Sequence, residues 1–317
     1  MKIVVTGAAG FIGSNLVKEL ASQYHKVTCI DALIDTTYPR DIKLSRWVEL
    51  KKIPNLALIE KDLREGNLES YIEDAEVILN LAAMPGLLDS WTNFDLYGSC
   101  NITATHRLLD AHLRLKSKAK LIHISTSSVY GKIATVGESG PTLPYSPYGV
   151  TKLAAENLIR AFADNTSLDF NILRYFSVYG PGQRPDMAYS KFISAIYNNE
   201  VINIYGDGAQ SRTNTYISDC INATLMIIKN GVSNAIYNVS GSEEVNLLKV
   251  ISILEEIIGN KARINFMPGR IGDQLTTKGN IKRLITDTGF EPTVGVYQGL
   301  KNQVDYFLNS KKHKIER

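Results

Sequence analysis

The sequence predicts a doubly wound α/β fold, in which a parallel sheet is covered by helices on both faces. Short apolar runs alternate with longer amphipathic stretches through the first half of the chain. The runs are continuously apolar, as in strands buried on both sides, and right-handed crossovers place helices over each face. The expected strands are 2–6, 26–30, 56–60, 77–81, 120–126 and 170–176, and the expected helices are 11–22, 92–116 and 148–163.

The alternation of strands and helices breaks after about residue 176. Gly/Pro-rich turns such as YGPGQRP and MPGRIGD then separate shorter elements. Loops after the carboxyl ends of strands usually build the substrate side of such a fold. We therefore expect a first domain over 1–176 and a smaller α/β substrate-binding lobe over most of 177–317. The strand-like run AIYNV at 235–239 predicts that the chain returns to the first domain around 214–240.

The composition argues against several classes of protein. With 317 residues, 44% of them hydrophobic and 21% charged, the chain is an ordinary globular protein. Its formal net charge of +3 is spread along the chain, so no nucleic-acid partner is expected. Three distant cysteines suit reduced thiols in the cytoplasm, and the histidines lack metal-ligand spacing. We expect no secretory leader and no membrane-spanning segment.

A glycine-rich turn, TGAAGFIG at 6–13, directly follows the first strand and opens the first helix. Glycines there allow a tight turn and let N–H groups at the helix N-terminus approach a pyrophosphate. Asp31 ends the second strand, about 20 residues later, where a carboxylate can accept hydrogen bonds from a ribose diol and repel a 2′-phosphate. The pattern favours NAD over NADP, although Asp31 also suits a helix N-cap or a turn.

Two further segments are expected at the same edge of the sheet. Asp62 follows the third strand, and 81–83 (LAA) follow the fourth. Because the carboxyl ends of parallel strands meet at one edge, these residues can line the adenine and ribose of the cofactor.

Tyr148 and Lys152 are the strongest candidates for catalysis. They begin a helix after Ser-Pro, and their i, i+4 spacing puts both side chains on one face. An ammonium beside a phenol lowers the phenol's pKa, so Tyr148 can act as a general base while Lys152 holds the nicotinamide ribose. Tyr297 and Lys301 repeat this spacing in the C-terminal helix, without a neighbouring hydroxyl-bearing strand, and we interpret them as a solvated helix face.

A run of hydroxyl side chains ends the fifth expected strand. The stretch HISTSSVYG places four of them in succession over 125–128. A strand end needs one or two such groups for capping, so the others call for a further explanation.

Together, these motifs resemble a known family. GAAGFIG, HISTSSVYG, SPYGVTK, RYFSVYGPGQRPDM and YGDGAQSR occur in one order across most of the chain. They are similar to the extended short-chain dehydrogenase/reductase family of NAD-dependent nucleotide-sugar epimerases and dehydratases. The resemblance implies a Rossmann-type fold, tightly bound NAD, a UDP-sugar substrate and transient oxidation at sugar carbon 4. It also implies a homodimer joined through 92–116 and 148–163.

Residue-by-residue matching implies the site. The catalytic residues are Thr126, Tyr148 and Lys152. The cofactor-binding residues are Gly7, Gly10, Phe11, Ile12, Gly13, Asp31, Asp62, Leu63, Leu81, Ala82, Ala83, Asn101, Tyr148, Lys152 and Tyr175. The substrate-binding residues are Pro85, Thr126, Ser127, Ser128, Tyr148, Ser177, Arg184, Met187, Tyr205, Arg212, Arg270 and Asp273. Of these, Arg212 and Arg270 match positions that contact the diphosphate. Tyr205 suits either uracil stacking or an ordinary core aromatic.

The hydroxyls bear on the choice of sugar. Relatives that dehydrate the sugar carry acidic residues at the positions of Ser127 and Ser128, and decarboxylating relatives carry Glu at the second. Epimerisation needs neither. The motif RPDM at 184–187, with Ser177 where many sugar epimerases carry Asn, resembles the UDP-glucuronate 4-epimerases. Neutral hydroxyls can hold a carboxylate without supplying a base, and Arg184 can contact the sugar or its phosphate.

Several alternatives stay open from the sequence. Ser127 and Ser128 also suit a simple turn, and Arg184 a surface ion pair. The rival functions are a 4-epimerase for neutral UDP-glucose or UDP-N-acetylglucosamine, a UDP-glucuronate decarboxylase, and a non-catalytic NAD-binding regulator. The chain also departs from the family at three positions. Thr213 and Asn214 replace an Asp and an aromatic residue after Arg212, and Leu88 replaces an Arg of related glucuronate epimerases.

Overall fold

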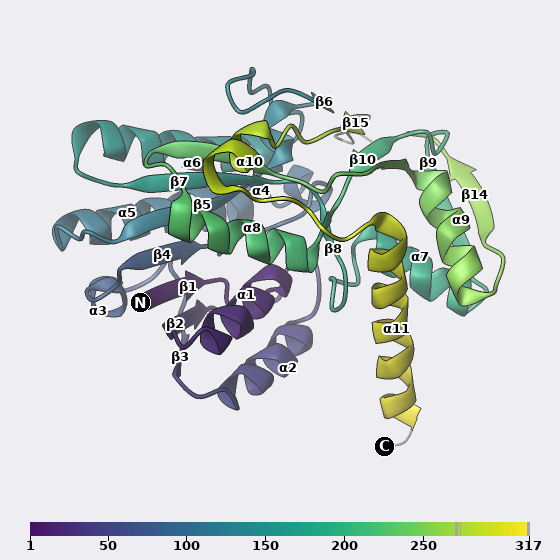
Figure 1. Cartoon of the computed structure of the whole chain (residues 1–317), viewed down its shortest axis with the longest axis horizontal. Helices are drawn as coiled ribbons and strands as arrows, with labels where there is room; N and C mark the ends of the chain where they lie inside the picture. Colours follow the sequence, from purple (N-terminus) through teal and green to yellow (C-terminus); the bar gives the residue numbers. More distant parts are fainter. Residues whose placement is uncertain (270–271, 273, 316–317) are drawn as a thin grey trace.

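The apolar runs of the first half form one parallel sheet at the centre of the molecule (Figure 1). The computed structural model describes residues 1–269, 272 and 274–315. Within them, seven strands pair in the order β12-β7-β5-β4-β1-β2-β3. They are β1 Lys2–Thr6, β2 Lys26–Asp31, β3 Leu56–Glu60, β4 Val77–Asn80, β5 Lys120–Thr126, β7 Phe170–Tyr175 and β12 Ala235–Val239. The predicted doubly wound α/β fold is confirmed.

Helices cover both faces of the sheet because its strands bury both sides. Ile3 and Val5 belong to one apolar layer, and Val4 between them belongs to the other. One face carries α1 Phe11–Ser22, α2 Arg40–Lys51, α8 Ile217–Asn230 and α10 Lys282–Thr288. The other carries α3 Glu69–Ile72, α5 Ala104–Arg114 and α6 Pro147–Asn165. The late strand β12 pairs with β7, so the chain does return to the sheet after its excursion into the lobe.

The helix expected over 92–116 is broken in the structure. A 3-10 turn over Asp89–Trp91, α4 Phe94–Tyr97 and a π-helical turn over Gly98–Thr103 precede α5. The wide π turn contains Asn101, whose amide bonds both the backbone of Met84 and the hydroxyl of Thr151. The π-helical turn that interrupts the expected helix thus coincides with the contacts of Asn101 to Met84 and Thr151, which the periodicity of the sequence did not predict.

The remaining elements form a smaller lobe, at the right of Figure 1. It contains α7 Ala188–Tyr197, α9 Leu247–Ile258, α11 Val296–Ile315 and the paired strands β9 Val201–Tyr205 and β14 Arg263–Met267. Short strands connect the two parts: β6 Ile133–Ala134, β8 Val178–Tyr179, β10 Ser211–Thr213, β11 Thr215–Tyr216, β13 Glu244–Asn246 and β15 Thr276–Thr277. No helix in the described part of the chain is long and apolar enough to cross a membrane.

Candidate active site

The strand order reverses between β1 and β4, and a cavity opens at the carboxyl ends of the strands there. β1 leads outward to β2 and β3, whereas β4 leads to β5 and β7. Doubly wound folds bind their ligands at this switch point. The cavity has a volume of about 740 Å³ and is lined by the glycine-rich turn, by strand ends of the sheet and by residues of the lobe.

The glycine-rich turn approaches the backbone after β4 too closely for side chains. Gly7 has a φ of +69°, and an added Cβ would lie 2.9 Å from the backbone nitrogen of Ala82. A Cβ on Gly13 would collide with the carbonyl oxygen of Gly7. The turn therefore sets the N-terminus of α1 beside the cavity, where its N–H groups and helix dipole favour an anion.

Asp31 and Asp62 are two carboxylates that line the cavity. Each Asp31 oxygen accepts one backbone N–H, from Ala9 at 3.0 Å and from Leu33 at 2.9 Å. A carboxylate has about four lone-pair sites, so acceptor capacity remains for a diol. Asp62 is paired with Arg64, whose guanidinium donates to both of its oxygens and lowers its pKa.

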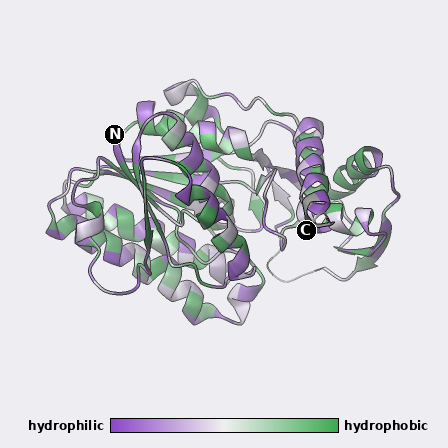
Figure 2. Ribbon diagram, turned by 90° about the horizontal axis from the view of Figure 1, so that it is seen from below, coloured by the Kyte–Doolittle hydropathy of each residue, from purple (hydrophilic) through white to green (hydrophobic). Residues whose placement is uncertain are grey.

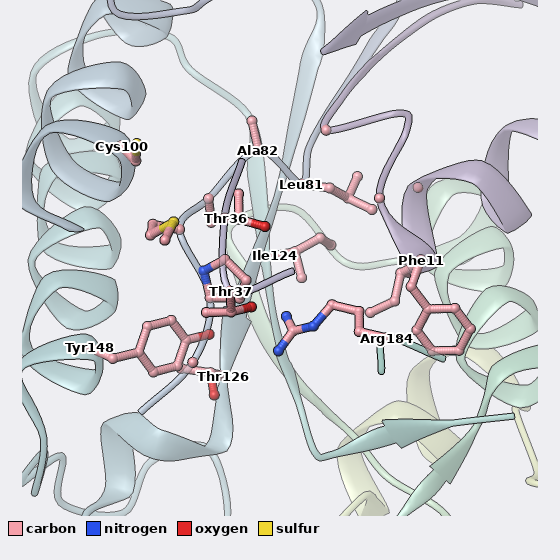
Figure 3. A pocket seen from close by; sticks show the side chains of 18 of the residues that line it. Phe11, Thr36, Thr37, Leu81, Ala82, Cys100, Ile124, Thr126, Tyr148 and Arg184 are labelled. Carbon is pink, nitrogen blue, oxygen red and sulfur yellow. The ribbon is translucent and has the colours of Figure 1, made fainter. Parts of the chain in front are cut away.

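Tyr148 and Thr126 line the same cavity and lie side by side in Figure 3. Burial raises the pKa of Tyr148, while a hydrogen bond from Thr126 and the positive charge of Arg184 lower it. Burial also lowers the pKa of Lys152, to about 8, against the raising effect of Glu156. The sequence-based expectation that Lys152 lowers the pKa of Tyr148 is thus not what the structure gives. Burial dominates both groups, and the opposing charge at the phenol comes from Arg184.

Lys152 has a polar partner that the sequence did not indicate. Its Nζ lies 3.3 Å from Nε2 of His123, whose Nδ1 lies 3.1 Å from the Asn80 amide nitrogen. Asn80 in turn accepts from the Thr6 hydroxyl at 2.8 Å. His123 is fully buried, and burial holds its pKa well below the usual range, so the ring is neutral. This chain of contacts ties the ends of β1 and β4 and the middle of β5 to α6.

The four hydroxyl side chains of residues 125–128 have different contacts in the structure. Thr126 caps the 3-10 turn Ser127–Tyr130 by accepting the backbone N–H of Ser128 at 3.1 Å. Ser125 instead donates to Glu156 on α6. Ser127 and Ser128 are buried and line the cavity. The backbone of this stretch therefore forms a turn, as one of the two interpretations expected. The hydroxyls of Ser127 and Ser128 also line the cavity, so they remain candidates for binding the substrate.

Arg184 forms an ion pair with Asp186, and this pair lies in the cavity wall and not on the outer surface of the protein. Its guanidinium donates to both oxygens of Asp186, at 3.0 and 2.8 Å, and its side chain is 15% exposed. Both residues line the cavity. In Figure 3 the guanidinium points into the cavity, between Tyr148 and Phe11.

Most of the predicted site residues meet in this one cavity. The lining includes Gly7, Gly10, Phe11, Ile12, Gly13, Asp31, Asp62, Leu63, Leu81, Ala82, Ala83, Pro85, Thr126, Ser127, Ser128, Tyr148, Lys152, Tyr175, Ser177, Arg184, Met187 and Arg212. Asn101 and Tyr205 lie outside it. Asn101 positions neighbours, because its amide binds Met84 and Thr151. Arg270 and Asp273 fall outside the described residues.

A sequence model of the NAD dependent epimerase/dehydratase family matches residues 3–240. This chain belongs to that family. The predicted NAD cofactor and nucleotide-sugar epimerase activity are confirmed. The residues present suit that cofactor, because the glycine-rich turn leaves the N-terminus of α1 open to a pyrophosphate and Asp31 keeps acceptor capacity for a ribose diol.

Relatives match nearly the whole chain. YtcB of Bacillus subtilis (strain 168), named as an uncharacterized UDP-glucose epimerase, is 40% identical over 310 residues, 96% of this chain and 98% of YtcB. A UDP-glucuronate 4-epimerase of Thermodesulfobacterium geofontis is 34% identical over 314 residues, 96% of this chain and 95% of the relative. A UDP-glucuronic acid 4-epimerase of Bacillus cereus, solved with UDP-glucuronic acid and NAD, aligns with a TM-score of 0.94 at 39% identity, covering 98% of this chain and 100% of that chain.

The departures of this epimerase from the family pattern have structural roles. Thr213 is buried, and its hydroxyl oxygen accepts from Ser240 at 2.7 Å and from the backbone N–H of Gly279 at 2.8 Å. It thereby joins β10 to the segments that follow β12 and β15. Asn214 donates to the hydroxyl of Tyr189. Leu88 is 46% exposed and contributes an apolar patch to the cavity wall.

The second Tyr-x-x-x-Lys pair, Tyr297 with Lys301, is exposed on a helix of the lobe and does not line the cavity. Tyr297 is 46% exposed, Lys301 is also exposed, and Tyr297 donates to Glu256 at 3.1 Å. Both are on α11, which is largely hydrophilic in Figure 2. Their interpretation as a solvated helix face is confirmed.

Proposed function

We propose that this enzyme interconverts UDP-glucuronate and UDP-galacturonate by epimerisation at carbon 4. One observation carries the proposal: the cavity wall beside Tyr148 presents the buried hydroxyls of Thr126, Ser127 and Ser128, with Ser128 where decarboxylating relatives have Glu. Hydroxyl donors can hold a sugar carboxylate without accepting a proton from it. The similarity to the UDP-glucuronic acid 4-epimerase of Bacillus cereus supports the same substrate.

The chain's own groups have the following roles. Tyr148 removes the proton of the 4-hydroxyl and later returns it, with Thr126 donating a hydrogen bond to the phenol oxygen. The positive charge of Arg184 opposes the effect of burial, which raises the pKa of Tyr148. When bound, NAD accepts a hydride from carbon 4 and gives it back. Arg212, on the cavity wall, suits the diphosphate about which the keto sugar turns.

The hydroxyls also protect the substrate. Glucuronate oxidised at carbon 4 is a β-keto acid, and it loses carbon dioxide when its carboxylate leaves the ketone plane. In our proposal Ser127, Ser128 and Ser177 donate to that carboxylate, while Thr126, whose single proton goes to the phenol oxygen of Tyr148, lines the wall beside them. All four line the cavity.

The direct test combines a substrate panel with one double variant. The protein is incubated with UDP-glucuronate, UDP-glucose and UDP-N-acetylglucosamine, and the products are identified by NMR. We expect turnover of UDP-glucuronate to UDP-galacturonate. Ser127→Ala together with Ser128→Ala should raise the fraction of UDP-pentose and carbon dioxide formed. Turnover of UDP-glucose by the same variant is the matched control, because that sugar has no carboxylate.

A second candidate is a 4-epimerase of a neutral UDP-sugar. The 40% identity to YtcB, named as a UDP-glucose epimerase, favours it. Preference for UDP-glucose in a competition assay, with an unchanged product ratio in the double serine variant, would establish this alternative and remove the proposed role of the hydroxyls. Wild-type release of carbon dioxide would instead indicate a decarboxylase. A lack of turnover with every sugar would favour the regulator.

We also propose that the enzyme is a homodimer joined through the segments 92–116 and 148–163. Phe94 and Val150, from these two segments, are 48% and 47% exposed, and a partner subunit would cover such apolar side chains. Light scattering during size-exclusion chromatography gives the mass directly, and a monomer at micromolar concentration would refute the dimer.

A further inference from the structure

A row of polar side chains crosses the buried interior of the sheet and ends at Lys152. Thr6, Asn80 and His123 are direct neighbours on β1, β4 and β5, because the strand register pairs Thr6 with Asn80 and Asn80 with His123. Their exposed fractions are 0%, 1% and 0%. Strands buried on both faces normally carry apolar side chains at such positions, and buried polar groups need hydrogen-bond partners. The direction of each hydrogen bond in this row can therefore be followed from one strand to the next.

The hydroxyl of Thr6 fixes which way the Asn80 amide faces. The Thr6 oxygen accepts the backbone N–H of Ala82 at 3.1 Å, and its own proton goes to Oδ1 of Asn80 at 2.8 Å. A hydroxyl has only one proton, so a reversed amide would leave that proton without an acceptor. On its other side, Nδ2 of Asn80 donates to the hydroxyl oxygen of Thr105 at 3.4 Å, whose proton goes to the carbonyl of Asn101.

The Asn80 amide in turn fixes the tautomer of His123. Nδ2 of Asn80 lies 3.1 Å from Nδ1 of the ring. Because Nδ2 can only donate, Nδ1 accepts, and the proton of the neutral ring lies on Nε2. Burial holds the pKa of His123 well below its usual range, so the ring carries this one proton and no second. The Nε2–H group therefore faces Nζ of Lys152, 3.3 Å away.

The contact between His123 and Lys152 restricts the protonation of the lysine. An ammonium has three N–H donors and no acceptor, whereas a neutral amine has a lone pair. Two donors that face each other make no hydrogen bond. The contact is a hydrogen bond only when Lys152 is an amine whose lone pair accepts the Nε2–H of His123. The two N–H groups of that amine then remain for the nicotinamide ribose, which the family resemblance assigns to Lys152.

The charges nearest to Lys152 are compatible with a neutral amine. Its side chain is 2% exposed, and burial lowers its pKa to about 8. The carboxylate of Glu156, one turn further along α6, opposes this effect. That carboxylate is already paired, because the guanidinium of Arg174 on β7 donates to both of its oxygens.

Other titratable groups on and around this part of α6 are neutral or paired. Burial raises the pKa of the phenols and the thiol there, so they carry no charge at neutral pH: Tyr97, Cys100, Tyr130 and Tyr148. Arg184, whose charge acts on Tyr148, is paired with Asp186. The charge of Asp89, on the 3-10 turn beside α4, acts on Tyr97.

We propose that His123 is a positioning residue for Lys152. Its Nε2–H binds the lone pair of Nζ and so favours the neutral amine, which gives the site a second proton acceptor one helical turn from Tyr148. His123 itself does not line the cavity, so it acts on the reaction through Lys152. The assignment rests on the NAD-dependent epimerase activity of the family and is independent of which sugar is epimerised.

The tautomer of His123 can be measured without any substitution. In protein labelled with 15N-histidine and carrying its NAD, the resonances of the two ring nitrogens distinguish a protonated nitrogen from an unprotonated one. The signals of His123 are assigned by their loss in His123→Gln. We expect the proton on Nε2. A proton on Nδ1 would overturn the assignment, because Nε2 would then accept from a Lys152 ammonium.

His123→Gln tests the effect on Lys152. The Gln amide can turn its oxygen toward Nζ, which favours the ammonium. The titration of Lys152, followed by NMR of its 13C-labelled Cε, should therefore move to higher pH, by about tenfold in proton affinity. The matched control is His112→Gln: His112 is 8% exposed on α5 and binds the carbonyl of Ala119, so the titration of Lys152 should stay in place. A Lys152 titration at the same or lower pH in His123→Gln would refute the proposal.

The pH dependence of the rate separates this role from a purely structural one. A proton acceptor with a raised pKa stays protonated up to a higher pH, so the acid limb of kcat/KM should move to higher pH in His123→Gln. The rate at neutral pH should fall about tenfold and should recover as the pH is raised. A loss of equal size at every pH would make His123 a structural residue only. The two NMR measurements need no substrate, so their outcome is separate from that of the sugar panel.

Discussion

Replacement of Arg174 by Met should destabilise this enzyme strongly, because it breaks the buried ion pair that anchors α6. Arg174 and Glu156 are 1% and 0% exposed, and the guanidinium donates to both Glu156 oxygens at 3.0 and 2.7 Å. It also donates to the Tyr130 hydroxyl at 2.9 Å. Without Arg174, Glu156 keeps only Ser125 and the distant Arg160, 3.8 Å away, among its described partners.

The expected cost is about 3–5 kcal/mol, the usual range for a buried charge that loses its partner. That is a large part of the roughly 5–15 kcal/mol by which domains are stable. Urea unfolding followed by circular dichroism measures it, with the NAD content held constant. Catalysis should also weaken, because Lys152 lies one helical turn from Glu156 on α6.

A double-mutant cycle separates the pair from its packing. Arg174→Met combined with Glu156→Met should recover most of the lost stability, since apolar side chains of similar volume can replace a buried pair at little cost. The matched control is Arg114→Met, which removes an exposed partner of Asp110 at 2.9 Å and should change stability little. A cost below about 1 kcal/mol for Arg174→Met, or strictly additive single effects, would refute the reasoning.

Three further predictions concern the site itself. Tyr148→Phe should lower kcat about 100- to 10,000-fold with NAD still bound, and equal loss of NAD would indicate a binding role instead. Arg184→Gln removes a charge that lowers the pKa of Tyr148, so the acid limb of the kcat/KM profile should move to higher pH; an unmoved limb contradicts this. Gly13→Ala should cost about 1–3 kcal/mol and reduce NAD content, because its methyl meets the Gly7 carbonyl. Gly98→Ala, with nothing within 4 Å of the added atom, is its control, and equal effects would exclude the clash.

Much of this enzyme could be predicted from local sequence patterns. The apolar runs marked every strand of the central sheet, because strands buried on both faces need apolar side chains throughout. Asp31 and the glycines were recognisable because a turn between a strand and a helix imposes close approaches on neighbouring residues. Tyr148 and Lys152 were recognisable because helical spacing puts them on one face next to a hydroxyl-bearing strand, a context that Tyr297 and Lys301 lack.

Tertiary structure decided how these groups behave. The pKa of Tyr148 is raised and that of Lys152 is lowered because burial outweighs nearby charges, and burial depends on the whole fold. His123 meets Lys152 because the order of β4 and β5 and the packing of α6 bring them together. The sequence by itself determined the strands of the central sheet and the glycine-rich turn, since these follow from short-range patterns, and it marked Tyr148 and Lys152 as candidates for catalysis. Only the folded chain decided the solvation of those side chains and their distant partners, because contacts such as Arg174 with Glu156 form where separate elements pack.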